Sequence, residues 1–391
     1  MRRTVLVLVW TGVLGAAGAG AAWEGDWIEE ATTYALPPPQ AFIGGCAFDQ
    51  DGAPLVFDGE ALVRMQSGGG AEEIYRPSEP VFGSFVKVRG AKAYFGESTN
   101  GTITEIDLAT RASRVVEVVA FNTDLAFDAA GRAFVSAPSP NASDGEPLNG
   151  FFLLDLDPAT PPDLVVEVPG YSGPLVFGPG GDLFIATAGG MVPGDVLRFP
   201  AAAVEAGIGP SHATAAGGAV FCAQLPGAYG LVFGSFGYLY AADSVSGRIT
   251  AIRPDGTAFT WAAPAEGYAS ATSIDYDPAG GRLLFVSSDY QTFNALTVLP
   301  TDYRFRRGMV NADAMLDIAD GVALLRYLFA GAWFAPNLDA GDVNDDGALD
   351  IADPVYLLRY LFARGAPPPE PFENEGLDPT PGLGSLQPHG L

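Results

Sequence analysis

Histidine and cysteine are nearly absent from this chain of 391 residues, which contains two of each. The histidines are His212, in a Gly/Ala-rich stretch, and His389, near the C-terminus, and neither belongs to a metal-binding motif. Their scarcity argues against a zinc site and against a catalytic triad built on histidine. The cysteines, Cys46 and Cys222, can form one disulfide or remain as two buried thiols.

Basic residues are also few, since 20 Lys and Arg stand against 46 Asp and Glu and give a formal net charge of −26. Nucleic acids and anionic membrane surfaces attract proteins that present a basic face. We therefore expect neither as a partner. After the N-terminal region no segment has 18 uninterrupted apolar residues, so the sequence predicts no membrane span.

The N-terminus has the organisation of a secretory signal peptide. Met1-Arg2-Arg3 precedes an apolar run from Val5 to about Gly15, and Ala19-Gly20-Ala21 has the small residues of a cleavage site. The run is too short to span a bilayer as a permanent helix. We predict a signal peptide over residues 1–22 and a secreted, extracellular or cell-surface protein.

Glycine and proline are abundant, with 50 and 32 residues, which favours short strands and many turns. Six copies of one kernel, an apolar strand before a tight turn, recur at spacings of 39, 40, 50, 56 and 43 residues. The kernels are Cys46–Gly52, Phe85–Gly90, Leu125–Gly131, Leu175–Gly181, Leu231–Gly237 and Ile274–Gly280. These spacings fit one four-stranded sheet per kernel and predict a mainly β chain with a six-bladed β-propeller over 23–304. An irregular β-sandwich is the alternative.

Three short motifs in the fifth repeat resemble a known kind of propeller. Leu239–Ser244, Gly247–Ile249 and Pro254–Gly256 resemble an NHL repeat, and the same pattern occurs in gluconolactonase-like propellers. The resemblance covers about 40–300 and implies the fold more firmly than an activity.

The gluconolactonase resemblance also implies a divalent metal in the central channel, held by a Glu of the first blade, an Asn and an Asp. The corresponding first-blade segment, Phe42–Cys46, has no Glu. Asn122, Asp124 and Asp243 are partial matches to the other ligands.

Four carboxylates stand near predicted strand ends, where propellers place groups that face the channel: Glu97, Asp124, Asp243 and Asp289. A pair of them can serve as acid and base in a hydrolase of the lactonase or glycoside hydrolase class. The alternative is that they cap turns or face water.

The stretch Asp342–Asp353 has the spacing of a calcium loop, with glycine at position 6. Calcium needs six to eight oxygen ligands, which alternate residues of a tight loop supply. The predicted ligands are the side chains of Asp342, Asn344, Asp346, Asp350 and Asp353 and the carbonyl of Ala348. A solvated acidic turn that opens a helix is the alternative.

A second copy of this loop lies 33 residues earlier. Its predicted calcium ligands are Asn311, Asp313, Asp317, Asp320 and the carbonyl of Met315. Met309 stands where position 1 needs an Asp, and Ala314 replaces the glycine of position 6. We therefore expect this first site to be weak or empty.

An apolar helix follows each loop. Apolar residues at 318, 322, 325 and 329, and at 351, 355, 358 and 362, have helical spacing, which predicts one buried face per helix. The duplicated loop and helix, with Leu-Leu-Arg-Tyr-Leu in each copy, resemble a type I dockerin, an EF-hand-like all-α module that docks onto cohesins. Both copies carry Ile-Ala at loop positions 10 and 11, where many dockerins have hydroxyl residues.

Together these patterns predict four segments: a signal peptide (1–22), the propeller (23–304), a dockerin-like calcium-binding domain (305–365) and a Pro/Gly-rich, poorly ordered tail (366–391). The favoured function is an exported propeller that binds or scaffolds, attached to a cohesin-like or cell-surface protein partner. The alternative is an extracellular carbohydrate-active hydrolase or lactonase, and dockerin resemblance links both to polysaccharide breakdown. A third reading makes the calcium module purely structural.

Overall fold

The computed structural model describes residues 23–24, 28–36, 45–66, 70–142, 147–156, 160–187, 194–208, 213–214, 218–225, 227–234, 237–264, 270–277, 282–288, 293–300, 305–311, 315–330, 338–374 and 376. The predicted signal peptide, His212, Asp289, Asp313 and His389 lie outside these residues. None of the helices formed by the described residues has the length and apolar character needed to cross a membrane.

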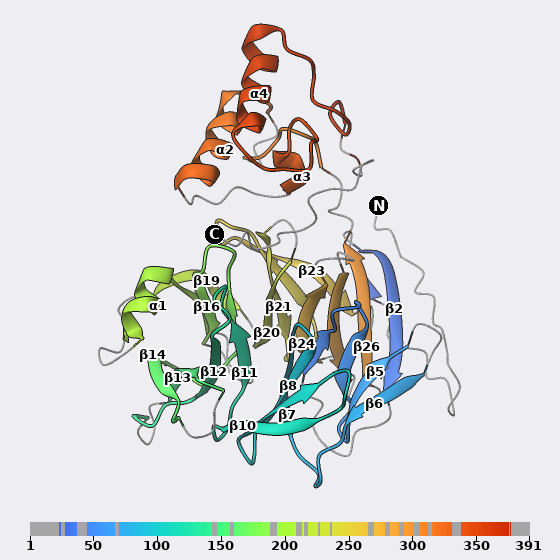
Figure 1. Ribbon diagram of the computed structural model, residues 1–391, viewed down its shortest axis with the longest axis vertical. Helices are drawn as coiled ribbons and strands as arrows, with labels where there is room; N and C mark the ends of the chain where they lie inside the picture. Colours follow the sequence, from blue (N-terminus) through green and yellow to red (C-terminus); the bar gives the residue numbers. More distant parts are fainter. Residues whose placement is uncertain are drawn as a thin grey trace.

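Within the described part of the chain, the strands form six largely antiparallel sheets of four or five strands (Figure 1). The first two sheets contain β3 (Cys46–Phe48), β4 (Pro54–Phe57), β5 (Leu62–Met65) and β6 (Ala71–Tyr75), and then β7 (Gly83–Arg89), β8 (Lys92–Glu97), β9 (Thr102–Asp107) and β10 (Ser113–Val118). The next two contain β11 (Asp124–Phe127), β12 (Ala133–Pro138), β13 (Leu148–Leu154), β14 (Asp163–Pro169) and β18 (Ala213–Thr214), and then β15 (Leu175–Phe177), β16 (Leu183–Ala186), β17 (Gly194–Phe199) and β19 (Ala219–Leu225). The last two contain β20 (Ala228–Phe233), β21 (Leu239–Asp243), β22 (Ile249–Ile252), β23 (Ala258–Pro264) and β1 (Trp23–Glu24), and then β24 (Ser270–Asp277), β25 (Arg282–Ser288), β26 (Phe293–Pro300) and β2 (Ile28–Leu36). A short helix, α1 (Ala201–Gly207), follows β17.

Each sequence kernel forms the first strand of a separate sheet, and these six inner strands are β3, β7, β11, β15, β20 and β24. Each inner strand contacts the next, and β24 contacts β3, so the six strands close a ring. A ring of radially arranged sheets is the architecture of a β-propeller. The predicted fold class, mainly β with a propeller, is therefore confirmed.

The N-terminal strand closes the ring. β2 pairs with β26 from Ile28 opposite Pro300 to Leu36 opposite Phe293, so the last sheet combines the two ends of the propeller sequence. The short β1 pairs with β23 in the preceding sheet. Backbone hydrogen bonds thus hold the N-terminal strand in the last sheet and cover β26, which would otherwise be an open edge.

Apolar side chains fill the spaces between adjacent sheets. Between the first and second sheets, for example, Phe57 and Phe95 lie with ring centroids 4.7 Å apart. Cys46 in β3 and Cys222 in β19 are both buried and unbonded, in separate clusters, so they are two thiols and not a disulfide.

The C-terminal module, which we define as the described residues from 305 to 376, contains α2 (Ile318–Ala330), α3 (Leu338–Gly341) and α4 (Ala352–Ala363). The helices α2 and α4, orange and red in Figure 1, contact each other. Leu324 of α2 and Leu357 of α4 occupy equivalent repeat positions, and both are fully buried with Phe305, Val310 and Val343.

The predicted buried faces of α2 and α4 are wrong. Residues 318, 322 and 329 of the first copy, and 351, 355 and 362 of the second, are all exposed, while 325 and 358 are half-buried. The cause is the carboxylate that ends each loop. Asp320 and Asp353 turn inward to accept N–H bonds from their own loops, and the leucine four residues later lies on the same helix face.

The beginning of the Pro/Gly-rich tail packs on the module, contrary to the expectation of poor order. Phe305 and Gly376 exchange two backbone hydrogen bonds of 3.0 Å, and the Arg307 N–H donates to the Pro371 carbonyl at 2.6 Å. The ring of Phe372 is buried, with its centroid 5.2 Å from that of Tyr360. The ordered module therefore extends past residue 365.

Candidate functional site

A pocket of about 300 Å³ opens at the channel mouth, the end of the ring at which β7 and β11 begin. Its lining comes from the start of β7, the turn after β8, the turn before β11, and β20 of a more distant sheet. The lining residues are Phe82, Gly83, Ser84, Ser98, Thr99, Phe121, Asn122, Thr123 and Tyr229. Among the described residues, aromatic rings, hydroxyls and one amide line this pocket, and none of these lining side chains is charged.

Two aromatic rings of the pocket are open to solvent, with Phe82 53 % and Phe121 61 % exposed. Phe121 has φ +56°, in the left-handed region that bulky residues rarely adopt. Its N–H donates to the Ser98 carbonyl at 2.9 Å, which holds the turn in this conformation. Strained backbone of this kind concentrates at ligand-binding sites, because the surrounding structure must stabilise it.

The buried side chain of Asn122 holds this turn in place through hydrogen bonds. Its side chain is fully buried, and its Nδ2 donates to the carbonyls of Glu97 at 3.0 Å and Val119 at 3.1 Å. The Ser84 hydroxyl donates to Asn122 Oδ1. The predicted metal ligand Asn122 therefore has its amide engaged in positioning the residues beside the pocket.

The three described carboxylates of the predicted set have separate partners. Glu97 accepts the Thr102 hydroxyl, Asp124 forms an ion pair with Lys87, and Asp243 accepts the Val245 N–H at 2.7 Å within its own turn. Asn122 Nδ2 contacts the Glu97 carbonyl, but among the described residues Glu97, Asp124 and Asp243 do not form a group that could hold a metal. The residues present thus do not fit the metal site of the gluconolactonase resemblance.

Lys87 and Asp275 are charged residues of the inner ring that the sequence did not single out. Lys87 Nζ lies 3.0 Å from Asp124 Oδ1, and Asp124 Oδ2 accepts the Leu175 N–H at 3.2 Å. Asp275 Oδ2 accepts the Phe48 N–H at 2.7 Å. Burial raises the pKa of Asp275 to about 6, against the opposing charge of Lys87.

Burial and the neighbouring opposite charges also act against each other on the pKa values of Asp124 and Lys87. Burial raises the pKa of Asp124, although the Lys87 ammonium favours its charged form. Burial alone would lower the pKa of Lys87, but the charges of Asp124 and Asp275 outweigh it and the pKa is raised. Lys87 is therefore a stable cation at neutral pH.

The alignment of the sequence kernels is wrong by one residue at Lys87. The kernels Phe85–Gly90 and Leu125–Gly131 place Lys87 opposite Phe127. In the structure Val86 and Leu125 are the equivalent residues, because each packs against the preceding sheet. Lys87 therefore corresponds to Ala126. The hairpin after β7 is short, with Arg89 opposite Lys92, whereas Phe127 pairs with Ala133 across a longer turn.

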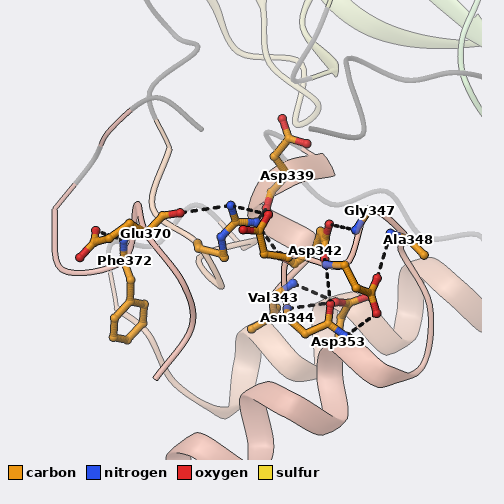
Figure 2. Close-up of polar contacts among 12 residues, drawn as sticks. Asp339, Asp342, Val343, Asn344, Gly347, Ala348, Asp353, Glu370 and Phe372 are labelled. Atoms are coloured by element: carbon orange, nitrogen blue, oxygen red, sulfur yellow. Dashed lines mark hydrogen bonds and ion pairs between the residues drawn. The ribbon is translucent and has the colours of Figure 1, made fainter. Parts of the chain in front are cut away.

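The second predicted calcium loop is folded around its last carboxylate (Figure 2). Asp353 Oδ1 accepts the N–H groups of Val343 at 2.9 Å and Asn344 at 3.4 Å, and Oδ2 accepts that of Asp350 at 2.8 Å. Asp342 accepts the N–H groups of Asp346 at 3.1 Å and Gly347 at 2.9 Å. These bonds give both carboxylates fixed positions inside the loop.

Gly347 provides the turn at position 6 of this loop. Its φ is +80°, and a Cβ there would meet no atom within 4 Å, so backbone conformation and not space requires glycine. Ala348, the predicted carbonyl ligand, donates its N–H to Asp346 Oδ1 at 3.0 Å. Asp346 Oδ2 accepts an N–H of Asn344 at 2.8 Å.

The first loop has the same bonds at equivalent positions. Asp320 Oδ1 accepts the N–H groups of Val310 at 2.9 Å and Asn311 at 3.3 Å, and Oδ2 accepts that of Asp317 at 2.9 Å. Met315 is 62 % exposed, and Asp313 lies outside the described residues. The duplication in the sequence is therefore a duplication of local structure.

The donors of the second loop suit a hard cation, because carboxylate and amide oxygens recur at the required spacing. Burial raises the pKa of Asp342, and burial together with the charge of Asp342 raises that of Asp353 to about 6. A bound cation would relieve this repulsion. Even so, the described residues contain no group of three or more His, Cys, Asp or Glu side chains arranged to hold a metal.

Arg307 links this loop to the tail, a role the sequence did not predict. Its side chain is fully buried and donates to the carbonyls of Asp342 at 2.8 Å, Asp339 at 3.1 Å and Glu370 at 3.2 Å. It also lies 3.1 Å from Asp345 Oδ1. Figure 2 shows the tail residues Glu370 and Phe372 on the opposite side of Asp342 from Gly347 and Ala348.

Comparison with known proteins identifies the propeller by its fold. No model of a protein family matches the sequence, and no curated protein matches it. A gluconolactonase from Xanthomonas campestris has a similar structure, with a TM-score of 0.53 and 15 % identity over 70 % of this chain and 91 % of the other. Regucalcin from Agrobacterium tumefaciens, described as a calcium-binding protein, gives 0.48 and 15 % over 68 % and 94 %. At such identities a likeness shows the fold alone, and the structure from Xanthomonas campestris confirms a gluconolactonase-like propeller.

Proposed function

We propose that this is an exported binding protein whose six-bladed propeller takes a small, uncharged, hydroxyl-rich ligand of the sugar class at the channel mouth. The composition of the pocket lining carries the proposal. Two exposed rings, Phe82 and Phe121, offer faces for stacking, and Ser98, Thr99 and Tyr229 offer hydroxyls for hydrogen bonds. A charged ligand would find no opposite charge in this lining.

Titration of the full mature chain with a panel of neutral mono- and oligosaccharides tests the proposal by calorimetry. We expect binding of at least one sugar, weakened ten-fold or more by Phe121→Ala. Tyr171→Ala is the matched control, because Tyr171 is a comparably exposed ring (58 %) outside the pocket lining. Equal sugar affinity in Phe121→Ala and Tyr171→Ala would show that the sugar does not bind in this pocket.

We further propose that the loop 342–353 binds Ca²⁺ through Asp342, Asn344, Asp346, Asp350, Asp353 and the Ala348 carbonyl. The buried, mutually repelling carboxylates of Asp342 and Asp353 support this assignment. The first loop, with Asn311, Asp313, Met315, Asp317 and Asp320, is the weaker site because position 1 is Met309. Calcium binding of this kind stabilises the folded module.

A calcium titration of the full chain tests the loop. The double variant Asp342→Ala/Asp353→Ala should lose the tighter site, whereas Asp107→Ala, which removes a carboxylate that caps an exposed turn, should keep it. Unchanged calcium uptake in the double variant would contradict the assignment.

The exposed stripes of α2 and α4 support a docking role for the module. Each stripe has Ile, Val and Phe at equivalent positions, and Phe329 and Phe362 are 71 % and 67 % exposed. We propose a cohesin-like extracellular protein as the partner. Interferometry of the full chain against purified cohesins should show binding that Phe329→Asp/Phe362→Asp abolishes. Binding to no cohesin, or self-association through these rings, would contradict this assignment.

Hydrolysis of a sugar lactone or glycoside is the second candidate function. Glu97 favours it, because this buried carboxylate directly precedes Ser98 of the pocket lining, and the propeller has the fold of a gluconolactonase. Incubation with aldonolactones and aryl glycosides tests it. Turnover that falls at least 100-fold in Glu97→Gln would support an enzyme, and turnover indifferent to Glu97 would not.

A further inference from the structure

The inner ring contains one layer of six equivalent positions, defined by its packing. In each inner strand one residue packs against the preceding sheet, and the next residue faces the following sheet. The residues that face the following sheet are Ala47, Lys87, Ala126, Val176, Val232 and Asp275. Four of the six are small and apolar, so Lys87 and Asp275 are the two exceptions.

Ala47 stands between the two exceptions, because β3 separates β24 from β7 in the ring. Phe48 of the same strand donates its N–H to Asp275 Oδ2 at 2.7 Å, so β3 binds Asp275 on one side and contacts the strand of Lys87 on the other. On the other side, Lys87 Nζ reaches Asp124 Oδ1 of the following sheet at 3.0 Å. The Lys87 ammonium is therefore paired with Asp124, and only β3 separates its strand from the strand of Asp275.

The two carboxylates are held in place independently of Lys87. Asp124 Oδ2 accepts the Leu175 N–H, and Asp275 Oδ2 accepts the Phe48 N–H. Carboxylates fixed by backbone in a low-dielectric interior require a cation nearby. The side chain of Lys87 supplies it, with 22 % of its surface exposed.

We propose that the Lys87 ammonium is the resident cation of the propeller ring, standing in for a divalent metal, and that its removal opens a site for an oxygen-preferring divalent cation between Asp124 and Asp275. Gluconolactonase-like propellers are expected to hold such a metal, but the residues here do not fit one. Asn122 has its amide engaged, Asp243 closes its own turn, and a lysine covers Asp124. The sugar-binding proposal is independent of this assignment.

Mn²⁺ binding, followed by electron paramagnetic resonance, tests the proposal in the full chain. Asp342→Ala/Asp353→Ala serves as the background, so that the C-terminal loop does not contribute. In this background we expect no Mn²⁺ binding that depends on Asp124. Adding Lys87→Met, which keeps the side-chain length but removes the charge, should create one Mn²⁺ site per chain. This variant should bind Mn²⁺ at least ten-fold more tightly than the background protein does. Adding Asp124→Asn should remove that site again.

Two control variants distinguish loss of the Lys87 charge from a general disturbance of the fold. Lys87→Arg keeps a cation and should gain no site. Lys92→Met removes a more exposed lysine that pairs with Glu105, and it should gain none either. Failure of Lys87→Met to bind Mn²⁺ while folded would overturn the proposal.

The background protein decides the question even if Lys87→Met does not fold. A Mn²⁺ site that is present with Lys87 intact and is abolished by Asp124→Asn would show that Lys87 is not the resident cation. Absence of any Asp124-dependent site, with Lys87→Met folding only when Mn²⁺ is added, would support the proposal.

Discussion

At the scale of one residue, Phe121 combines a strained backbone with a side chain exposed to solvent at the channel mouth. The residue is held at φ +56° with most of its ring in solvent, so its side chain contributes little burial. A left-handed conformation costs a non-glycine residue roughly 1–2 kcal/mol. The neighbouring Asn122 makes three hydrogen bonds that hold the turn in this conformation.

Replacing Phe121 by glycine should therefore separate stability from binding. We expect Phe121→Gly to be as stable as the parent or more stable by up to about 1 kcal/mol, because glycine adopts this φ without strain. Sugar binding should fall at least ten-fold. Chemical denaturation and calorimetry measure the two effects, and Phe82→Gly is the control, since Phe82 is exposed without a positive φ. A clear loss of stability in Phe121→Gly would contradict the strain argument.

Asp275 predicts a pH effect on the stability of the propeller. Its pKa is about 6 in the folded protein against 3.8 as the ordinary value, because burial favours the neutral form. The folded state thus holds the extra proton between these values, and stability from this group is fully present below pH 3.8 and lost as pH rises through 6. The loss is at most on the order of 3 kcal/mol.

The variant Asp275→Asn tests this effect, because its amide oxygen can still accept the Phe48 N–H. Unfolding followed by tryptophan fluorescence, to which Trp261 between the last two sheets contributes, should be compared at pH 4.5 and pH 7. We expect the parent to lose more stability than the variant over this interval. An equal change in both proteins would exclude Asp275 as the cause.

At the scale of the helix, the leucine and phenylalanine positions of α4 should respond differently. Leu357 is fully buried, whereas Phe362 is 67 % exposed on the same helix. Leu357→Ala should destabilise the module by about 2–5 kcal/mol, because it leaves a cavity among packed residues. Phe362→Ala should change it by less than about 0.5 kcal/mol. Limited proteolysis of the full chain measures the difference, and similar rates for both variants would contradict the assigned helix faces.

The helix faces also show what the sequence could and could not predict. Spacing located α2 and α4 and their equivalence, since Leu324 and Leu357 are buried alike. It assigned the wrong face, because apolar side chains were taken as the buried ones. The decisive contact is polar: Asp320 and Asp353 turn inward to their loops, and hydropathy carries no sign of this.

In the propeller, too, the sequence pattern predicted the strands but not the contacts between residues far apart in the chain. Repeated kernels were enough to predict six inner strands, because an apolar strand followed by a turn is a local signal. They could not predict that β3 alone separates the strand of Lys87 from that of Asp275, which is 188 positions away in the sequence. The pocket was missed for a similar reason, since Phe121 and Tyr229 come from different sheets.

At the scale of the whole molecule, the N-terminal strand should decide the stability of the ring. β2 supplies the fourth strand of the last sheet and pairs with β26 along its length. A chain that begins at residue 38 should therefore unfold at a temperature lower by several degrees than one that begins at residue 23. Differential scanning calorimetry compares the two, and equal midpoints would show that the strand is not needed for closure.

The most direct test of the account is a crystal structure of the full mature chain, grown with Ca²⁺ and soaked with the tightest sugar of the panel. The account predicts sugar density against Phe121, within reach of Ser98 and Tyr229. Sugar bound elsewhere on the propeller, with the channel mouth empty at saturating concentration, would contradict it.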